Sequence, residues 1–395
     1  MDRLDLVPAA QRAERLFLLD VLAGRERDFD VDADAFLAIA PSKLHPFLHA
    51  RLRERSLPPA LRETLSAAHR RNAMKELRRA AELRRIDTAL GAAGIPYLVL
   101  KGPVLAATVY PDRASRTMTD LDFLLHESDL PRATAVLGEA GYRMPPQFAG
   151  AELAAGDAPP LIHDEPGGPS IELHTMLDSL PDDRDALANM LPSSRRVAIG
   201  HGLELRTLDR GELFAHVVLH VSKHHRFEGE LRSLLDVALL LHAERDLDWS
   251  VLAAAWERRG ILEWMVLTVS LAHLLLDAPV PAALAAHAAS EEALALAAEQ
   301  LWIVEKGTVP PRLTFIATGT ELSPVHAGVP AHHAPVPPGI AGARARVARG
   351  LELLRRVATS GARGGLSRRV FSREVELFRR RERLFAMMEK PSARD

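Results

Sequence analysis

The sequence predicts an α+β fold in which a short strand-bearing core lies between two helical regions. The first 93 residues are rich in Ala, Leu, Arg and Glu, which favour helices. The next stretch alternates short strand-like segments with short helices, and helical periodicity returns after residue 210. We therefore expect an N-terminal helical region at 1–93, an α/β core at 94–209, a helical domain at 210–320, a Pro- and His-rich linker at 321–342 and a basic helical tail at 343–395.

The composition is that of an ordinary globular protein. The 395 residues suffice for two or more hydrophobic cores, with 47% hydrophobic and 26% charged residues. The absence of cysteine excludes disulfides, thiolate metal sites and cysteine nucleophiles, and it agrees with a reducing compartment. The N-terminus lacks the features of a signal peptide, and no apolar run approaches the roughly 20 residues of a membrane span. These features predict a cytoplasmic protein without a membrane span.

Prolines delimit several helices in the N-terminal region. They occupy positions 41, 46, 58 and 59, and the longest predicted helix follows them at about 60–93. This helix leads directly into an apolar strand predicted at 95–101. We interpret the region as a helical platform that delivers the chain to the core.

The end of that first strand has the order of a phosphate-binding turn. Gly102 follows the strand, and Pro103 suits the first turn of a helix predicted at 103–109. A residue without a Cβ lets backbone amides and a helix N-terminus approach an anion. The same order is compatible with a glycine that serves the backbone alone.

Two aspartates alternate along a second predicted strand at 119–125. Because strand side chains alternate faces, Asp120 and Asp122 project from the same side, close enough to share a divalent cation. The strand is otherwise apolar, and unpaired carboxylates are costly to bury there. The alternative is that Asp120 caps a turn while Asp122 faces solvent on an edge strand.

A third carboxylate occurs on a later predicted strand at 170–175. Glu172 would complete a set of three acids, which is what two magnesium ions need in order to clamp phosphates and activate a hydroxyl. The alternative is a half-exposed strand with Glu172 and His174 on its polar face. The rest of the core is predicted to contain a helix at 129–140, a loop at 149–168 and strands at 196–199 and 203–207.

Several of these elements together resemble a known family. In chain order they are Leu100-Lys101-Gly102, Tyr110-Pro111, Arg116, Thr119-Asp120-Leu121-Asp122-Phe123-Leu124, Gly141-Tyr142 and Ile171-Glu172-Leu173-His174. This order resembles the uncharacterised nucleotidyltransferase family of the DNA polymerase β-like superfamily. The likeness covers roughly Leu83 to Leu241, and spaced elements in order are more specific than any one motif.

The resemblance implies a small mixed β-sheet core in which Asp120 and Asp122 are paired metal ligands and Glu172 fills the third carboxylate position. It also implies that Gly102 belongs to the turn that receives the nucleotide phosphates. The superfamily usually has serine after this glycine, whereas Pro103 stands here and removes a hydroxyl and a backbone amide. We therefore expect the phosphate contacts to come from other side chains, chosen by charge and position: Lys101, Arg113 and Arg116.

Histidines recur on a helical stretch beyond residue 210. His216, His220 and His224 lie four residues apart, so their rings form a stripe that borders Lys223 and His225. A transition-metal site is one interpretation, and solvated or packed histidines are another, since no acidic or cysteine ligand is interleaved. The family that the chain resembles carries a similar helix with His and Lys residues, and the resemblance implies that this helix closes over the active-site cleft. We prefer the interpretation in which Lys223 and His224 line that cleft without binding metal.

The resemblance thus implies Mg²⁺-dependent transfer of a nucleoside monophosphate from an NTP to an acceptor hydroxyl, with pyrophosphate leaving. The three carboxylates would hold the metal, and Glu172 would serve as the general base if one metal is present. Lys101, Arg116 and Lys223 would neutralise the developing charge. The acceptor stays open between a small molecule, a protein and an RNA.

Two alternatives accompany this hypothesis. In the first, the chain is a catalytically inactive nucleotide-binding or scaffold protein of the same fold, and the missing serine after Gly102 favours this alternative. In the second, the chain modifies RNA and binds it through the tail. From residue 340 onward there are fifteen Arg or Lys and six acidic residues, a net charge of +9, whereas the whole chain carries −2. A solvated arginine face, or docking of the tail on the acidic body, explains the same charges.

Overall fold

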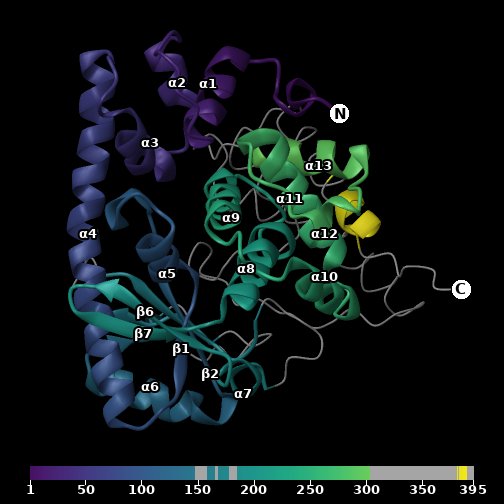
Figure 1. Cartoon of the computed structure of the whole chain (residues 1–395). Coiled ribbons are helices and arrows are strands. Elements are labelled where there is room, and N and C mark those ends of the chain that lie inside the picture. Colours follow the sequence, from purple (N-terminus) through teal and green to yellow (C-terminus); the bar gives the residue numbers. More distant parts are fainter. Residues whose placement is uncertain (147–157, 165–167, 178–184, 303–379, 381, 389–395) are drawn as a thin grey trace, which may run out of the picture.

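The computed structural model describes residues 1–146, 158–164, 168–177, 185–302, 380 and 382–388. It confirms the α+β prediction, because a five-stranded mixed sheet and a two-stranded sheet lie among helices. In Figure 1 the long helix α4 runs along one side of the molecule, the sheet occupies the lower part, and the helices after residue 210 gather opposite α4. The predicted linker at 321–342 lies outside the described residues.

The five-stranded sheet is the scaffold of the core. In spatial order its strands are β5 (Ser170–His174), β2 (Asp120–Leu125), β1 (Tyr97–Val99), β7 (Leu203–Thr207) and β6 (Arg195–Gly200). β2 is parallel to β5 and antiparallel to β1, β1 is parallel to β7, and β7 is antiparallel to β6. The sheet is therefore mixed, and its strands agree with four of the five predicted segments.

The first predicted strand, at 95–101, is too long. β1 ends at Val99, and α5 (Lys101–Thr108) begins almost at once. Pro103 is the third residue of this helix rather than the first, which costs no hydrogen bond because the first N–H groups of a helix have no intrahelical partner. Helix α5 contacts β2 and β6, so Lys101 and Gly102 stand where the sheet ends and the helix begins.

Buried apolar side chains hold β2 in the middle of the core. Every residue from Leu121 to Leu125 is buried, including Asp122, and Leu121, Phe123 and Leu124 are fully excluded from solvent. Each buried leucine or phenylalanine contributes roughly 1.5–3 kcal/mol relative to an exposed one. This packing fixes the register that determines where the carboxylates of β2 project.

The N-terminal region is helical, as predicted. It consists of η1 (Arg3–Leu6), α1 (Arg12–Leu22), α2 (Ala33–Ile39), η2 (Ser42–Leu44), α3 (His45–Leu52) and α4 (Pro59–Ala92). Helix α4 starts at a proline, which suits the first helical position, and Gly94 follows its end with φ +63°. Its 34 residues span about 51 Å, so the helix reaches from α3 past the sheet to α6.

Short elements complete the core. They are η3 (Arg113–Ser115), η4 (Glu127–Asp129), α6 (Leu130–Glu139), β3 (Tyr142–Arg143), β4 (Ile162–His163) and α7 (Ala186–Met190). Helix α6 agrees with the helix predicted at 129–140. Most of the loop predicted at 149–168 lies outside the described residues, and the described part contains β4, which pairs antiparallel with β3. That strand is only two residues long, so it has no alternating pattern to read.

The helices beyond residue 210 pack beside the sheet. They are α8 (Arg210–Leu219), the π-helical turn η6 (His220–His224), α9 (Leu231–Ala243), α10 (Trp249–Arg258), α11 (Leu262–Leu276), α12 (Ala282–Ala285) and α13 (Glu291–Leu301). The spacing of His216, His220 and His224 had suggested ordinary helical periodicity through this stretch. The structure instead widens the last turn into a π-helix, which changes the histidines that meet there.

Two arginines of the predicted tail pair with acids on α13. Arg380 contacts Glu299 at 2.9 Å, and Arg383 forms an ion pair with Glu292. In Figure 1 this short segment lies beside the helices of the last third. Most of the predicted tail, including all ten of its basic residues before Arg380, lies outside the described residues.

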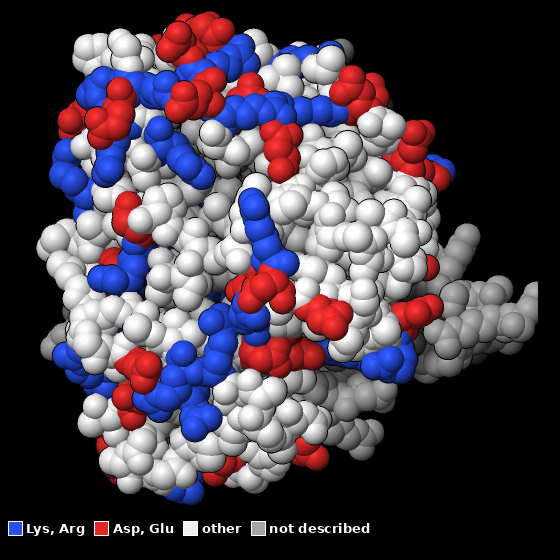
Figure 2. Space-filling view, viewed as in Figure 1, with Lys and Arg blue, Asp and Glu red and all other residues white. Residues whose placement is uncertain are grey.

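Charges of both signs share the surface. Figure 2 shows Lys and Arg side chains among Asp and Glu side chains on one face, and the residues drawn in colour form no broad area of basic side chains alone. Among the described residues, no helix combines the length and the apolar character needed to cross a membrane.

Candidate active site

Asp122 and Glu172 are direct partners across two parallel strands. The register of β2 and β5 places them opposite each other, with Asp120 opposite Ser170 on the same face. Asp122 is 5% exposed, whereas the Glu172 side chain is 26% exposed. The two strands that the sequence predicted separately therefore bring the three predicted carboxylates to one face of the sheet.

His174 joins this group, although the sequence had suggested only a polar strand position for it. Its Nε2 lies 3.0 Å from Asp122 Oδ1 and 3.9 Å from Glu172 Oε2. Possible ligand atoms of Asp122, Glu172 and His174 all lie within 4.8 Å of one another. The alternation Glu172-x-His174 was the available signal, because it puts both residues on the face that carries Asp122.

The carboxylates differ in how readily they ionise. Burial and the charges of Asp122 and Asp120 raise the pKa of Glu172 to about 7. Burial and Asp122 likewise raise the pKa of Asp120. For Asp122, burial is outweighed by the nearby Lys101 ammonium and the hydrogen bond from His174, which hold its pKa below the ordinary value. The group therefore combines one carboxylate that ionises readily, Asp122, with two whose ionisation is disfavoured, Asp120 and Glu172.

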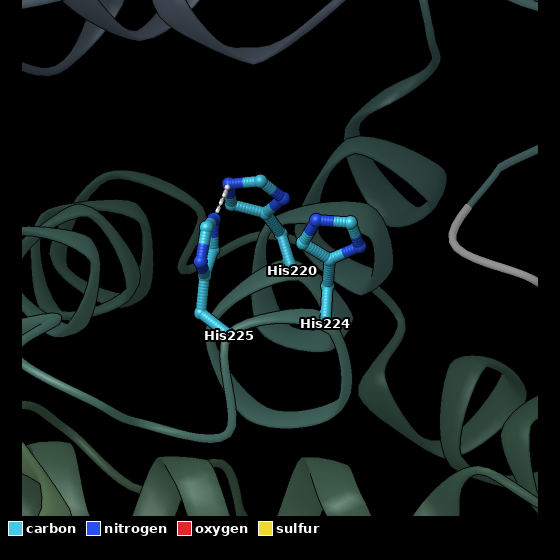
Figure 3. Close-up of side chains that lie close together, drawn as sticks. All are labelled: His220, His224 and His225. Atoms are coloured by element: carbon cyan, nitrogen blue, oxygen red, sulfur yellow. Dashed lines mark hydrogen bonds between the residues drawn. The ribbon is translucent and has the colours of Figure 1, made fainter. Parts of the chain in front are cut away.

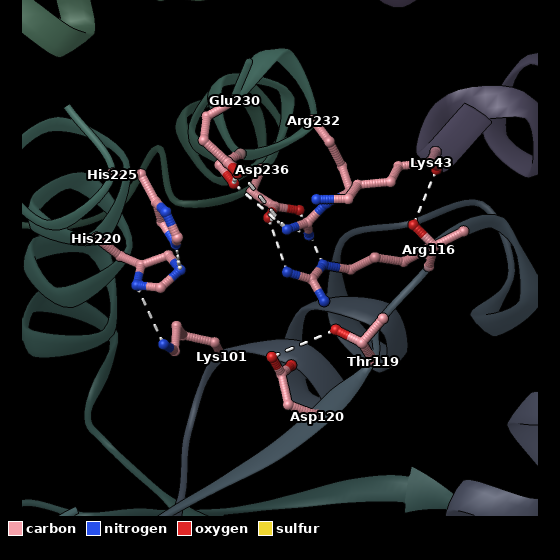
Figure 4. A network of polar contacts seen from close by, with 12 residues as sticks. Lys43, Lys101, Arg116, Thr119, Asp120, His220, His225, Glu230, Arg232 and Asp236 are labelled. Atoms are coloured by element: carbon pink, nitrogen blue, oxygen red, sulfur yellow. Dashed lines mark hydrogen bonds and ion pairs between the residues drawn. The ribbon is translucent and has the colours of Figure 1, made fainter. Parts of the chain in front are cut away.

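Lys101 connects the carboxylates to the histidines of η6. Its Nζ lies 3.6 Å from Asp122 Oδ2. The same Nζ lies 3.2 Å from His220 Nδ1 (Figure 4). Its backbone has φ +28°, a value that residues with a Cβ seldom adopt. A strained residue at a strand-to-helix junction is typical of functional sites, where the surrounding fold imposes the conformation.

Arg116 is buried and bound by an acid from the helical region. Its Nε and Nη2 donate to the two carboxylate oxygens of Asp236 at 2.9 and 2.8 Å, and Tyr110 donates to the same carboxylate at 2.7 Å. Arg116 is 5% and Asp236 2% exposed. The third nitrogen, Nη1, lies 3.2 Å from the position that a Cβ on Gly102 would take. Arg116 therefore borders the glycine turn, while Asp236 fixes its orientation.

Sequence reasoning missed the cations that come from outside the core. Arg232 lies at the start of α9, 3.4 Å from Asp236 and 3.9 Å from Glu230. Burial alone would raise the pKa of Glu230, but its interactions with His225, Arg232 and Lys43 outweigh that effect and lower the pKa to about 2. Figure 4 shows these side chains around the same space that Lys101, Arg116 and Asp120 border. Nothing in the local sequence links them, because they meet only through tertiary packing.

Arg113 does not join the group. Its guanidinium lies 3.3 Å from His201 and 3.8 Å from Glu76, and it packs against Gly200 at the end of β6. Strand β6 is at the opposite edge of the sheet from β5. The expected phosphate contact from Arg113 therefore has no support in its position.

The predicted histidine stripe is also rearranged. His224 is exposed and stacks on His220, with ring centroids 5.3 Å apart, and Lys223 lies beside it on η6. His216 is one turn away, 6.4 Å from the ring of His220. The residue that completes the group is His225, whose Nε2 lies 3.1 Å from that of His220.

A family model described as uncharacterised nucleotidyltransferase matches residues 30–277. The match contains the carboxylates, Lys101, Arg116 and the histidines of η6, and it extends on both sides of the span, 83–241, that the motifs suggested. No curated protein matches the chain. Since the matched span covers more than half of the sequence and contains the whole candidate site, the chain belongs to the family of uncharacterised nucleotidyltransferases.

Proposed function

We propose that this protein transfers a nucleoside monophosphate from an NTP to an acceptor hydroxyl, with Asp120, Asp122 and Glu172 holding Mg²⁺. The observation that carries the proposal is the pairing of Asp122 with Glu172 across parallel strands, with Asp120 on the same face. The family supports nucleotidyl transfer in general terms. The magnesium, the NTP and the acceptor hydroxyl are the finer parts of the proposal.

The donor set suits a hard divalent cation. Carboxylate oxygens are the ligands that Mg²⁺ prefers, and burial together with mutual repulsion raises the pKa values of Asp120 and Glu172, an effect that a divalent cation would oppose. His174 contributes by bonding to Asp122, as residues around metal ligands commonly do to orient them. A divalent cation held there would offset phosphate charge and make the acceptor hydroxyl more acidic.

The cations around the site fit a triphosphate. Lys101 and Arg116 border the space above Asp120 from different elements, and Arg232 and Lys43 lie further along it (Figure 4). We assign to these four the role of phosphate binding that the missing serine after Gly102 leaves open. Arg116, fixed through two of its nitrogens by Asp236, would present Nη1 beside the glycine turn.

Glu172 also fits the role of proton acceptor. A general base works best with a pKa near the working pH, and the pKa of about 7 meets that condition. If a single metal is held by Asp120 and Asp122, Glu172 would take the proton of the acceptor hydroxyl as that oxygen attacks the α-phosphate and pyrophosphate leaves. Lys101 would stabilise the charge that develops on the phosphates.

The function is tested with the purified chain, Mg²⁺ and each of the four NTPs labelled at the α-phosphate, in a cell extract that supplies acceptors. Transfer of label to a protein, RNA or small molecule, with release of pyrophosphate, is the expected result. Binding of NTP and Mg²⁺ by calorimetry without any labelled product or pyrophosphate, for all four NTPs, would contradict the proposal and favour a binding protein.

Replacing Lys101 with methionine should lower kcat for transfer roughly 100-fold, the order found when one donor that stabilises transition-state charge is removed. Methionine keeps the length of the side chain without its charge. Lys75→Met, an exposed position on α4, is the matched control and should leave kcat unchanged. The measurement is pyrophosphate release at saturating NTP, and equal rates for both variants would remove Lys101 from the mechanism.

Glu172→Gln should stabilise the metal-free protein at pH 8 and have little effect at pH 5. The pKa of Glu172 is raised from 4.5 to about 7 in the folded state, so the folded protein is penalised as this group ionises and loses stability between those two pH values. Glutamine removes the penalty. Urea unfolding in a chelator measures the difference.

With Mg²⁺ added at pH 8, the wild type should become more stable than Glu172→Gln, because the Glu172 carboxylate then binds a metal ion that glutamine does not bind. Glu139→Gln, on the exposed face of α6, is the control and should follow the wild type under all three conditions. If Mg²⁺ stabilises Glu172→Gln as much as the wild type, Glu172 is not a metal ligand.

A further inference from the structure

Three histidines form a second group of possible ligands, separate from the carboxylates. Figure 3 shows His220, His224 and His225 with their rings turned toward one another, and one ring nitrogen from each of the three lies within 4.8 Å of the other two. The ring of His225 lies 4.4 Å from that of His220 and 4.8 Å from that of His224. We call these three residues the histidine cluster.

The π-helical turn η6 creates the histidine cluster. In an α-helix, residues four apart share a face, but a residue five positions on lies well round the axis. Here the backbone N–H of His225 donates to the carbonyl of His220 at 3.0 Å, the five-residue bond of a π-turn. This places His225 over His220 while His224 remains beside both. Such turns are rare and occur frequently at functional sites.

The nitrogen spacing fits a tetrahedral metal ion. With metal–nitrogen bonds of about 2.0–2.1 Å, two ligands of a tetrahedral ion are about 3.3 Å apart. Nε2 of His220 and Nε2 of His225 lie 3.1 Å apart. The third ring, His224, is exposed, so its side chain can adjust and an ion can reach the cluster from solvent.

We propose that His220, His224 and His225 bind a transition-metal dication of the Zn²⁺ class, with a fourth position left for a non-protein ligand. Imidazole nitrogen selects Zn²⁺, Ni²⁺ or Cu²⁺ over Mg²⁺, so the histidine cluster and the carboxylates bind different metals. Burial lowers the pKa of His225 to about 4 and that of His220 below its ordinary range, which keeps these rings neutral, as ligands must be.

The hydrogen bond from Lys101 links the histidine cluster to the carboxylates. An ammonium only donates, so Nδ1 of His220 accepts this bond and Nε2 carries the ring proton in the metal-free chain. A metal bound at Nε2 shifts that proton to Nδ1 and ends the bond. The Lys101 ammonium then has Asp122 Oδ2, 3.6 Å away, as its partner. Zn²⁺ binding would therefore redirect a cation toward the carboxylates.

Metal binding by the full-length, chelator-stripped protein tests the proposal directly. Zn²⁺ is titrated in excess Mg²⁺, which occupies the carboxylates, and bound zinc is measured by mass spectrometry after gel filtration. One Zn²⁺ per chain is expected. His224→Ala and His225→Ala should each weaken binding by more than the about 10–100-fold that loss of an outer-shell partner costs. His224 is exposed, so its replacement leaves the fold intact.

Three control variants should retain the bound zinc. His242→Ala removes an exposed histidine on α9, Glu172→Gln weakens the carboxylate site, and a triple variant removes His326, His332 and His333 from the predicted linker. Cobalt substitution gives a second readout, since bound Co²⁺ should show visible absorption that His224→Ala abolishes. Undetectable zinc, full binding in both His224→Ala and His225→Ala, or loss of zinc in any control variant would overturn the proposal.

Discussion

Asp122→Asn should reduce kcat for nucleotidyl transfer by at least about 10³-fold, which corresponds to about 4 kcal/mol of transition-state stabilisation. Asp122 has the lowered pKa of the three carboxylates and contacts both Lys101 and His174, so it is the charge around which the site is organised. Asparagine keeps its shape but not its charge. Pyrophosphate release at saturating NTP and Mg²⁺ measures the loss.

The loss must be separated from unfolding. Asp34→Asn, at an exposed position on α2, is the matched control and should keep full activity. Thermal unfolding of Asp122→Asn should remain a single cooperative transition. Wild-type rates in Asp122→Asn and in Asp120→Asn would show that transfer does not depend on these carboxylates, whatever the family of the chain.

Asp236→Ala should destabilise the protein by about 3–5 kcal/mol, because it leaves the buried Arg116 guanidinium without its counter-charge. Burial alone would lower the pKa of Arg116, yet Asp236 holds it above the ordinary value, which shows how closely the two charges depend on each other. Tyr110 loses its acceptor in the same variant. The free energy of unfolding in urea measures the effect.

An exposed ion pair provides the comparison. Glu204 binds Arg196 at 2.8 Å on the β6–β7 hairpin, and Glu204→Ala should cost only about 0–1 kcal/mol. In the double variant Arg116→Met/Asp236→Leu, much of the stability should return, since neither charge is then buried alone. A small effect of Asp236→Ala, equal to that of Glu204→Ala, would contradict the role assigned to this pair.

Local patterns predicted the parts of the fold that local physics determines. The Asp120-x-Asp122 strand, the strand around Glu172 and the helices α4 and α6 were predicted closely, because alternation, capping residues and prolines act over a few neighbours. The parallel pairing of β2 with β5 was not readable in the same way. It depends on how the chain between them returns, and the sequence of the later part of that connection, at 149–168, has little periodicity.

The errors share a physical cause. Helix η6 became a π-turn although its apolar spacing fits an α-helix, so the group of histidines includes His225 instead of His216. Arg113 was chosen for its charge and its nearness in sequence, but η3 directs it toward His201. Arg232 and Lys43 were missed because they approach the site from distant helices. Side-chain direction and tertiary packing, rather than residue type, decided each case.

The Arg116–Asp236 pair has a consequence for handling the protein. Arg116 belongs to the segment before β2, whereas Asp236 belongs to α9. Each of the two parts of the chain, 94–209 and the helices after it, therefore supplies the counter-charge for a buried charge of the other. A protease that nicks the connection near residue 209 should leave two polypeptides that co-elute under native conditions. Truncated versions that stop before α9 should accumulate in inclusion bodies.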